Sequence, residues 1–198
     1  RRVLFRSRVR QAHHEFLHAG AELLITGSYQ VSRQGFVGAG YRASDADEAL
    51  RRSVVVARQA VAEFDASASK AGTQRRTPLV AASVGPYGAI LHDGSEYVGN
   101  YGISEGQLRE FHRERLDVLA ETDADLIAVE TIPDLCEVEV IVDLLTESPH
   151  LVATISCTLR DAGHLSAGQR LEALADLGTD QVLALGVNCC SVELIPAA

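Results

Sequence analysis

Strand-sized apolar runs that alternate with helical patterns constrain the fold of this chain more than any other feature. The alternation is regular from Val9 onward, and it is typical of strand-helix units built around a parallel sheet. Most of the apolar runs are nearly continuous, as in strands that are covered on both faces. The pattern predicts five strands, at residues 22–26, 78–84, 126–131, 151–158 and 182–188.

Apolar residues at spacings of three and four predict helices that turn one face toward the sheet. One such stripe consists of Val138, Ile141, Val142 and Leu145. Residues 104–107 and 166–169 also match the capping box, in which a Ser hydroxyl and a Gln side chain satisfy backbone donors at the start of a helix. We expect a helix to begin at each of them.

One long segment, residues 85–103, follows a predicted strand and has no regular pattern of its own. It contains five Gly and three Tyr residues. Loops of this length inside a compact domain are uncommon and often functional. We therefore expect this loop to cover a site.

The composition restricts the class of protein. With 198 residues, 46% of them hydrophobic, we expect one domain or part of a larger one. A net charge of −9 argues against a nucleic-acid partner.

The apolar runs fall short of the roughly 20 residues of a membrane-spanning helix. The four Cys residues form no CxxC pair, which favours a reducing, cytoplasmic location.

The first ten residues contain five Arg and no acidic residue. Their apolar stretch, Val3 to Phe5, is too short for the core of a secretory signal. We expect residues 1–7 to be a foreign or misassembled end, and residues 8–198 to form the domain.

Periodicity alone leaves two architectures open, a doubly wound sheet and an arc of a barrel. Neither GxGxxG nor GxxxxGK[ST] occurs, which argues against dinucleotide and nucleoside-triphosphate sites. In both architectures catalytic residues gather at the carboxyl ends of the strands. Glu130 is the only carboxylate at a predicted strand end. It is either a site residue or a carboxylate that serves the next helix, whose first residue we expect to be Pro133.

The adjacent thiols Cys189 and Cys190 end the last predicted strand. Neighbouring strand residues point in opposite directions, so at most one of them faces a site; both could also be packing residues. We expect Cys136 and Cys157 to be packing residues. The seven His residues have no paired spacing and are interpreted as surface and helix residues, and no GxSxG elbow supports a Ser-His-Asp triad.

Several motifs together resemble the homocysteine S-methyltransferase family. They are SVGPYGAILHDGSEYVGNYGIS, LREFH, ADLIAVETIPDLCEVE and LALGVNC, in collinear order from about Val9 to Ile195. The resemblance is to the members that use S-methylmethionine or S-adenosylmethionine. It implies an α/β fold, the (β/α)8 barrel, of which this chain covers roughly strands 2 to 6.

The resemblance implies a zinc ion held by three Cys thiolates, of which Cys189 is one. The family's other two ligands form a Gly-Gly-Cys-Cys motif that lies beyond this sequence, and the Asp-Gly-Gly motif of its first strand is also absent. The mechanism that the resemblance implies is deprotonation of the homocysteine thiol at zinc, after which its sulfur attacks the methyl group of the sulfonium donor. Glu130 matches the family glutamate that receives the homocysteine α-amino group.

Two other interpretations stay open. In the first, the chain as given is an inactive, truncated barrel with exposed strand edges. Alternatively it belongs to a barrel hydrolase or lyase that uses Glu130 while its cysteines only pack, although such an enzyme usually needs a second carboxylate.

Overall fold

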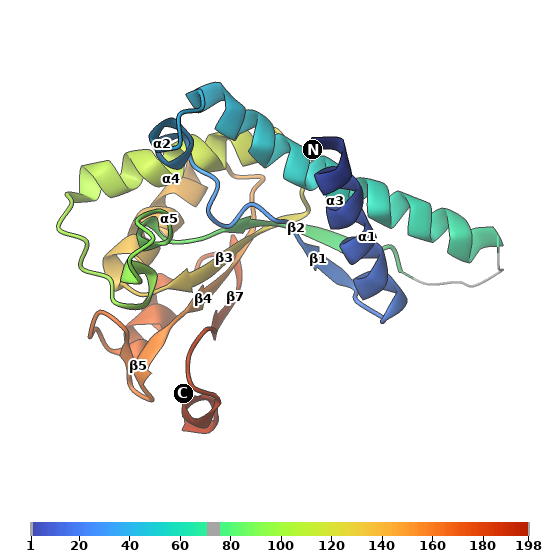
Figure 1. Cartoon of the computed structure of the whole chain (residues 1–198). Helices are drawn as coiled ribbons and strands as arrows, with labels where there is room; N and C mark the ends of the chain where they lie inside the picture. Colours follow the sequence, from blue (N-terminus) through green and yellow to red (C-terminus); the bar gives the residue numbers. More distant parts are fainter. Residues whose placement is uncertain (1, 71–75, 198) are drawn as a thin grey trace.

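The computed structural model describes residues 2–70 and 76–197 of the chain, with side chains for residues 7–70 and 76–195. Five parallel strands form the main sheet, in the order β1-β2-β3-β4-β7. They are β1 (Leu23–Ile25), β2 (Leu79–Val84), β3 (Leu126–Ile132), β4 (Ala153–Cys157) and β7 (Val182–Val187). All five predicted strands are confirmed, with bounds that differ by one or two residues. Within this sheet the strands follow one another as they do in the chain (Figure 1).

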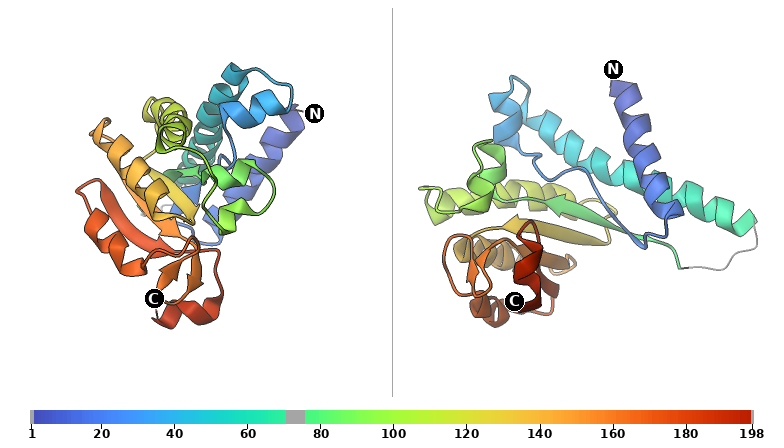
Figure 2. Two further views of the ribbon diagram at one scale, coloured as in Figure 1. Left: turned by 90° about the vertical axis from the view of Figure 1, so that its left-hand side faces the viewer. Right: turned by 60° about the horizontal axis from the view of Figure 1, so that its bottom comes forward.

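The main helices alternate with these strands. They are α1 (Arg2–His18), α2 (Arg33–Gly38), α3 (Ala43–Lys70), α4 (Glu105–Ala120) and α5 (Leu135–Thr146). In the left view of Figure 2, α3, α4 and α5 follow one another around the outside of the curved sheet. α1 runs without a break through the boundary expected between residues 7 and 8. None of the helices in the described ranges has an apolar stretch long enough to cross a bilayer.

The core lies between these helices and one face of the sheet. Leu24, Val80 and Ile127 project from the strands into the same apolar cluster as Leu50 of α3. The predicted stripe on α5 is buried in this cluster, because its residues share one face of the helix.

The face of the sheet that points away from these helices is exposed at its two edge strands, β1 and β7. Ala81, Leu126 and Ala128 form a small cluster there. The large apolar side chains of this face near the β1 edge, Leu23, Ile25 and Leu79, are exposed.

Leu183 and Leu185 of β7 are also exposed, but they lie on the helix side, because Leu185 pairs with Ile155 of the core. The expectation of strands covered on both faces holds for β2 and β3, whose residues are buried apart from Leu79 and Glu130. It is wrong for the edge strands β1 and β7, which have exposed residues.

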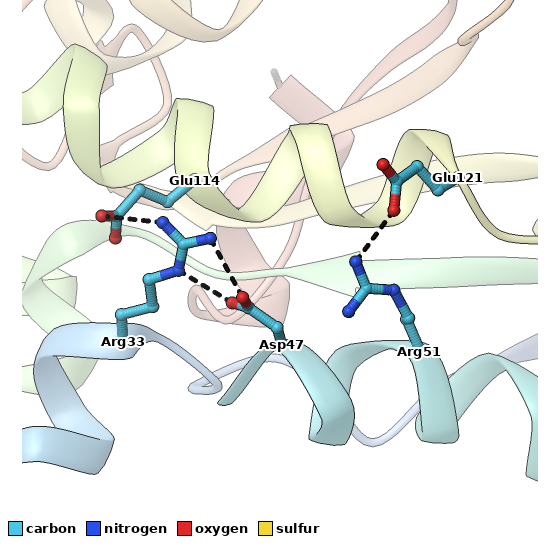
Figure 3. A network of polar contacts seen from close by, with 5 residues as sticks. All are labelled: Arg33, Asp47, Arg51, Glu114 and Glu121. Carbon is cyan, nitrogen blue, oxygen red and sulfur yellow. Dashed lines mark hydrogen bonds and ion pairs between the residues drawn. The ribbon is translucent and has the colours of Figure 1, made fainter. Parts of the chain in front are cut away.

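Ion pairs join the helices across the outer surface (Figure 3). Arg33, the first residue of α2, binds both carboxylate oxygens of Asp47 in α3, at 2.8 and 3.0 Å, and also Glu114 in α4, at 3.2 Å. Arg51 of α3 binds Glu121 at the end of α4, at 2.8 Å. Such exposed pairs contribute roughly 0–1 kcal/mol each, so the apolar contacts dominate the packing of these helices.

The two predicted capping boxes have different outcomes. Ser104 and Gln107 form the box at the start of α4, as predicted. The prediction at residues 166–169 is wrong, because Gly168 adopts φ 105° and Leu165 donates its backbone N–H to the carbonyl of Gln169. These residues form a turn, after which the 3-10 helix η3 (Leu171–Leu177) packs against α5.

A short antiparallel hairpin that the sequence analysis missed follows β4 directly. It consists of β5 (Leu159–Asp161) and β6 (His164–Leu165). Asp161 Oδ1 accepts the backbone N–H of Gly163 at 3.0 Å and so closes the turn. The Asp-Ala-Gly sequence was the available signal for it.

Candidate functional site at the strand ends

Hydroxyl groups join the carboxyl ends of β1, β2 and β3 around one carboxylate. The hydroxyl of Ser83 donates to Glu130 Oε1 at 2.6 Å. The backbone N–H of Ser83 donates to Thr26 Oγ1 at 3.0 Å, and the hydroxyl of Ser28 donates to the Ser83 carbonyl at 2.8 Å. Because Thr26, Ser28 and Ser83 are all buried, these bonds fix the half-buried Glu130 at the predicted edge of the sheet.

Glu130 does not serve the following helix. It lies inside β3, and the N-cap of α5 is Asp134, whose Oδ1 accepts the backbone N–H of Cys136 at 3.0 Å. Pro133 precedes this cap, so the prediction that it is the first helical residue is wrong. Since Asp134 satisfies the helix donor, the interpretation of Glu130 as a helix-terminal carboxylate loses its basis.

The next residue, Thr131, has a strained backbone. Its φ of 64° lies in the left-handed region, which is unusual for a β-branched residue. The strand register shifts here, between Val129 and Ile132. Strain of this kind persists only where the surroundings hold the residue in place, and it often marks a functional site.

Asn188, just after β7, holds Thr131 with a reciprocal pair of hydrogen bonds. Its Oδ1 accepts the backbone N–H of Thr131 at 3.0 Å, and its Nδ2 donates to Thr131 Oγ1 at 3.1 Å. Because a backbone N–H can only donate, the orientation of the Asn188 amide is determined. The hydroxyl proton of Thr131 is thus left for another acceptor, and it is donated to Cys189 Sγ at 3.4 Å.

The structure therefore brings Cys189 into contact with Thr131, the residue that follows Glu130 in β3. Cys189 is exposed and has φ 49°, while its carbonyl accepts the hydroxyl of Thr158 at 3.2 Å. Its neighbour Cys190 packs against the apolar core instead. One thiol of the pair thus lies beside the segment that carries Glu130, and the other does not.

The two remaining cysteines differ from each other. Cys157 is fully buried in β4, as predicted, and burial raises the pKa of its thiol to about 12, with a smaller contribution from Glu137. Cys136 is exposed in the first turn of α5, so the prediction that it is a packing residue is wrong. The cause is its place on the outward side of the helix, where it lines a cleft of about 320 Å³ together with Asp134 and residues 100–103.

Tyr29 lies between the long loop and Thr131. A Cβ atom on Gly85 would come within 2.5 Å of the Tyr29 ring, so only glycine allows this contact. Burial raises the pKa of Tyr29 to about 12, and the nearby Thr131 side chain opposes that shift. The tyrosine thus closes one side of the strand-end region.

The loop predicted to cover a site contains two 3-10 helices, η1 (Tyr87–Ile90) and η2 (Ser95–Tyr97). η2 contacts β3, which places the loop over the strand that carries Glu130 and Thr131. Within the described residues, Glu96 Oε2 is buried without a hydrogen-bond partner.

A buried polar network connects this loop to the helices. Glu137 of α5 has no exposed surface, and its Oε1 accepts the backbone N–H of Tyr87 at 2.6 Å while its Oε2 accepts the hydroxyl of Tyr101 at 2.9 Å. His112 Nε2 lies 2.7 Å from Glu137 Oε1. Arg115 Nη2 lies 2.8 Å from His112 Nδ1 and donates to the carbonyl of Gly85 at 2.7 Å.

This geometry determines the tautomer of His112. Arg115 can only donate, so His112 Nδ1 is an acceptor and the ring proton is on Nε2, from which it is donated to Glu137. Burial and, to a lesser degree, the charge of Arg115 lower the pKa of His112, so the ring is neutral. Burial also lowers the pKa of Arg115 to about 10, and its guanidinium lies 4.1 Å from the ring centroid of Phe111.

The sequence analysis missed this network, because it interpreted the His residues as surface and helix residues. His112 lies on a helix, but it is fully buried. A signal was present in the spacing. Leu108, Phe111, His112 and Arg115 recur at intervals of three and four, which places all of them on the buried face of α4.

Among the residues that the structure describes, no group of three or more His, Cys, Asp or Glu side chains could hold a metal ion. Cys189 offers an exposed sulfur at the strand ends, and a hydroxyl donor already faces it. A zinc site in a protein needs three or four protein ligands. Cys189 therefore fits the role of one ligand and not that of a whole site.

A parallel α/β sheet with a carboxylate, a strained threonine and a thiol at its strand ends defines an enzyme-like site of the kind found in α/β proteins. The model of the family described as homocysteine S-methyltransferase matches residues 4–198. The chain belongs to this family.

Curated relatives and solved structures agree with this assignment. Homocysteine S-methyltransferase YbgG of Bacillus subtilis (strain 168) is 43% identical over 191 residues, which cover 96% of this chain and 60% of the relative. Homocysteine S-methyltransferase of Escherichia coli (strain K12) is 43% identical over 192 residues, covering 96% and 61%. The chain thus spans about three fifths of the length of these relatives.

The crystal structure of the homocysteine methyltransferase MmuM from Escherichia coli in its oxidized form superposes with a TM-score of 0.90 at 42% identity, covering 98% of this chain and 65% of that one. The structure of its metallated form superposes with a TM-score of 0.88 at 41% identity, covering 98% and 70%. This relative therefore exists in a form that carries a metal.

Proposed function

We propose that the protein transfers a methyl group from a sulfonium donor, S-methylmethionine or S-adenosylmethionine, to the thiol of L-homocysteine, giving methionine. Family membership supports this activity. The observation that carries it is the contact between Thr131 and Cys189, which places an accessible thiol next to the segment that holds Glu130. The proposed partners are these small molecules, and nucleic acid and membrane are not among them.

The chain forms about five of the eight strands of a (β/α)8 barrel in this proposal. The strand order supports it, because consecutive right-handed crossovers between neighbouring strands place every helix on the same face. The open apolar face with Leu23, Ile25 and Leu79 would then be part of the barrel interior. The greater length of the relatives is consistent with further strands.

Cys189 would hold a zinc ion together with two Cys residues outside this chain. Bound zinc keeps a coordinated thiol deprotonated and therefore nucleophilic at neutral pH. Thr131 contributes the hydrogen bond that orients the Cys189 sulfur, and Asn188 fixes the proton of that bond. The free cysteines, all four within the described residues, support a reducing, cytoplasmic location.

Glu130 would bind the α-ammonium group of homocysteine. Ser83 already donates to its Oε1, which holds the carboxylate in one orientation at the strand end. A carboxylate positioned in this way forms a charge-assisted hydrogen bond with an ammonium group. The loop of residues 85–103, which contacts β3 through η2, would exclude water from the bound substrate.

The decisive experiment compares two serine variants of neighbouring cysteines in the full-length protein. We expect Cys189→Ser to lose the metal and at least 100-fold in methionine formation from homocysteine and S-methylmethionine, measured by mass spectrometry. Cys190→Ser is the matched control, because its thiol packs against the core. Equal metal content and equal activity in both variants would overturn the proposal. Absence of methionine formation in the unsubstituted full-length protein would favour a hydrolase or lyase that uses Glu130 instead.

A further inference from the structure

The long loop is fastened at both of its ends to one buried carboxylate. Tyr87, at the start of the loop, donates its backbone N–H to Glu137, and Tyr101, near the end of the loop, donates its hydroxyl to the same side chain. The two loop residues use different carboxylate oxygens. A single side chain of α5 therefore determines where both ends of the loop lie.

The same carboxylate is connected to the strand ends through side chains of α4. Glu137 accepts from His112, and His112 accepts from Arg115, which donates to the carbonyl of Gly85. A weaker bond at 3.5 Å joins Arg115 Nη1 to the carbonyl of Tyr29, which also accepts the backbone N–H of Gly85 at 3.1 Å.

Tyr29 completes the connection to the thiol. Its ring contacts Gly85 so closely that no side chain fits there, and its hydroxyl lies near enough to Thr131 and Cys189 for both to influence its pKa. Thr131 in turn donates to Cys189. A continuous series of contacts thus leads from Glu137 to the proposed metal ligand.

The arrangement is more elaborate than stability requires. Glu137, His112 and Arg115 are 0–1% exposed, and burying such groups costs free energy that well-packed apolar side chains would not. Buried polar groups do, however, specify one geometry where they are paired, and in this network the described side-chain atom without a partner is Arg115 Nε.

We propose that Glu137 is a positioning residue, which fastens both ends of the loop of residues 85–103 and, through His112 and Arg115, fixes Tyr29 against the strand ends. The functional part of this inference rests on the proposed methyl transfer. The structural part does not, because it concerns the position of the loop in the protein without substrate.

Amide hydrogen exchange of the chain, without metal or substrate, tests the structural part. Glu137→Gln is expected to accelerate exchange at least tenfold at both ends of the loop and less than twofold in β2 and β3. Tyr101→Phe keeps the ring and removes one bond, so it should accelerate exchange only near residue 101. Ile141→Val on α5 is the matched control, because Ile141 is equally buried but belongs to the apolar cluster.

Kinetics of the full-length protein tests the functional part. Glu137→Gln is expected to raise the KM for homocysteine about tenfold and to lower kcat by a smaller factor. Tyr101→Phe should change both constants in the same direction but less. Ile141→Val should leave both constants within twofold of those of the unsubstituted protein. Uniform exchange across sheet and loop in Glu137→Gln, or unchanged loop exchange in both network variants, would overturn the proposal. Loop-specific exchange in a protein without methyl transfer would keep the positioning role and remove the proposed function.

Discussion

The hydroxyl of Thr131 donates a hydrogen bond to Sγ of Cys189 at 3.4 Å, although 58 positions separate the two residues in the chain. Both residues have a positive φ, 64° for Thr131 and 49° for Cys189. The backbone strain and the contact therefore occur at the same place. This is expected where a site needs a geometry that unstrained strands do not provide.

Substitution of Thr131 separates the strain from the hydrogen bond. Ala and Gly both remove the hydroxyl, but only Gly adopts φ 64° without the left-handed penalty of about 1–2 kcal/mol. Glycine also loses about 0.5–1 kcal/mol through its greater freedom in the unfolded chain. We expect Thr131→Gly to be more stable than Thr131→Ala by up to about 1 kcal/mol in urea unfolding. An alanine variant more stable than the glycine variant by about 0.5–1 kcal/mol, the cost of glycine alone, would show that the backbone is not strained.

Glu130→Gln should weaken homocysteine binding. The substitution keeps the shape and removes the charge, so a charge-assisted bond of about 1.5–3 kcal/mol to the ammonium group is lost. We expect KM for homocysteine to rise about 10- to 100-fold in the full-length protein, with a smaller change in kcat. Ser83→Ala leaves the charge and removes only the bond that orients it, so its effect should be smaller. A KM that is unchanged in Glu130→Gln would contradict the binding role.

Gly85→Ala should destabilise the chain. The added Cβ atom would lie 2.5 Å from the Tyr29 ring, and overpacking of this kind costs about 1–3 kcal/mol. Gly186→Ala in β7 is the control, since its Cβ atom would meet Ser156 Oγ at an ordinary 3.7 Å. The measurement is the free energy of unfolding of each variant in urea, which should be lower for Gly85→Ala than for Gly186→Ala. Equal values for the two variants would mean that Tyr29 moves away at little cost.

Much of the sheet was predictable because its signal is local. Each run such as residues 126–131 carries its own apolar pattern, and the capping box at Ser104 lies within four residues. The position of Glu130 followed from the rule that site residues gather at strand ends.

The contacts that build the site could not be predicted in this way, because each joins residues from distant segments. Thr131 meets Asn188, and Glu137 meets Tyr87 and His112, only after several strands have paired. The second capping box failed for the same reason. Ser166 and Gln169 match the pattern, but the hairpin before them requires a turn there, and Gly168 supplies its φ of 105°.

The cysteines should differ in their rates of alkylation. Burial raises the pKa of Cys157 to about 12, so at pH 8 its thiol is almost entirely protonated and unreactive, and it is also inaccessible. We expect iodoacetamide at pH 8 to modify Cys189 at least 100-fold faster than Cys157 in the folded, metal-free chain, measured by peptide mass spectrometry. Unfolding in urea should remove this difference. Comparable rates in the folded chain would mean that β4 opens readily.

The stability of the chain should fall at acidic pH because of His112. Burial and the charge of Arg115 lower its pKa in the folded state, although Glu137 acts in the opposite direction. The unfolded chain has the ordinary value near ~6.5, so below that pH the unfolded state binds more protons than the folded state. Above about pH 7, His112 therefore does not change the free energy of unfolding. Below about pH 6.5, it lowers this free energy by up to about 1.4 kcal/mol for each pH unit.

Urea unfolding of the chain at pH 8 and at pH 5.5 tests this expectation. His13, whose pKa is also lowered by burial and by His14, adds a dependence of the same sign. His112→Gln keeps a donor for Glu137 but does not titrate, so the loss of stability between the two pH values should shrink and the part due to His13 should persist. His150→Gln, at an exposed position, is the control and should keep the full dependence. The same pH dependence in all three proteins would mean that His112 does not become charged on unfolding in this range.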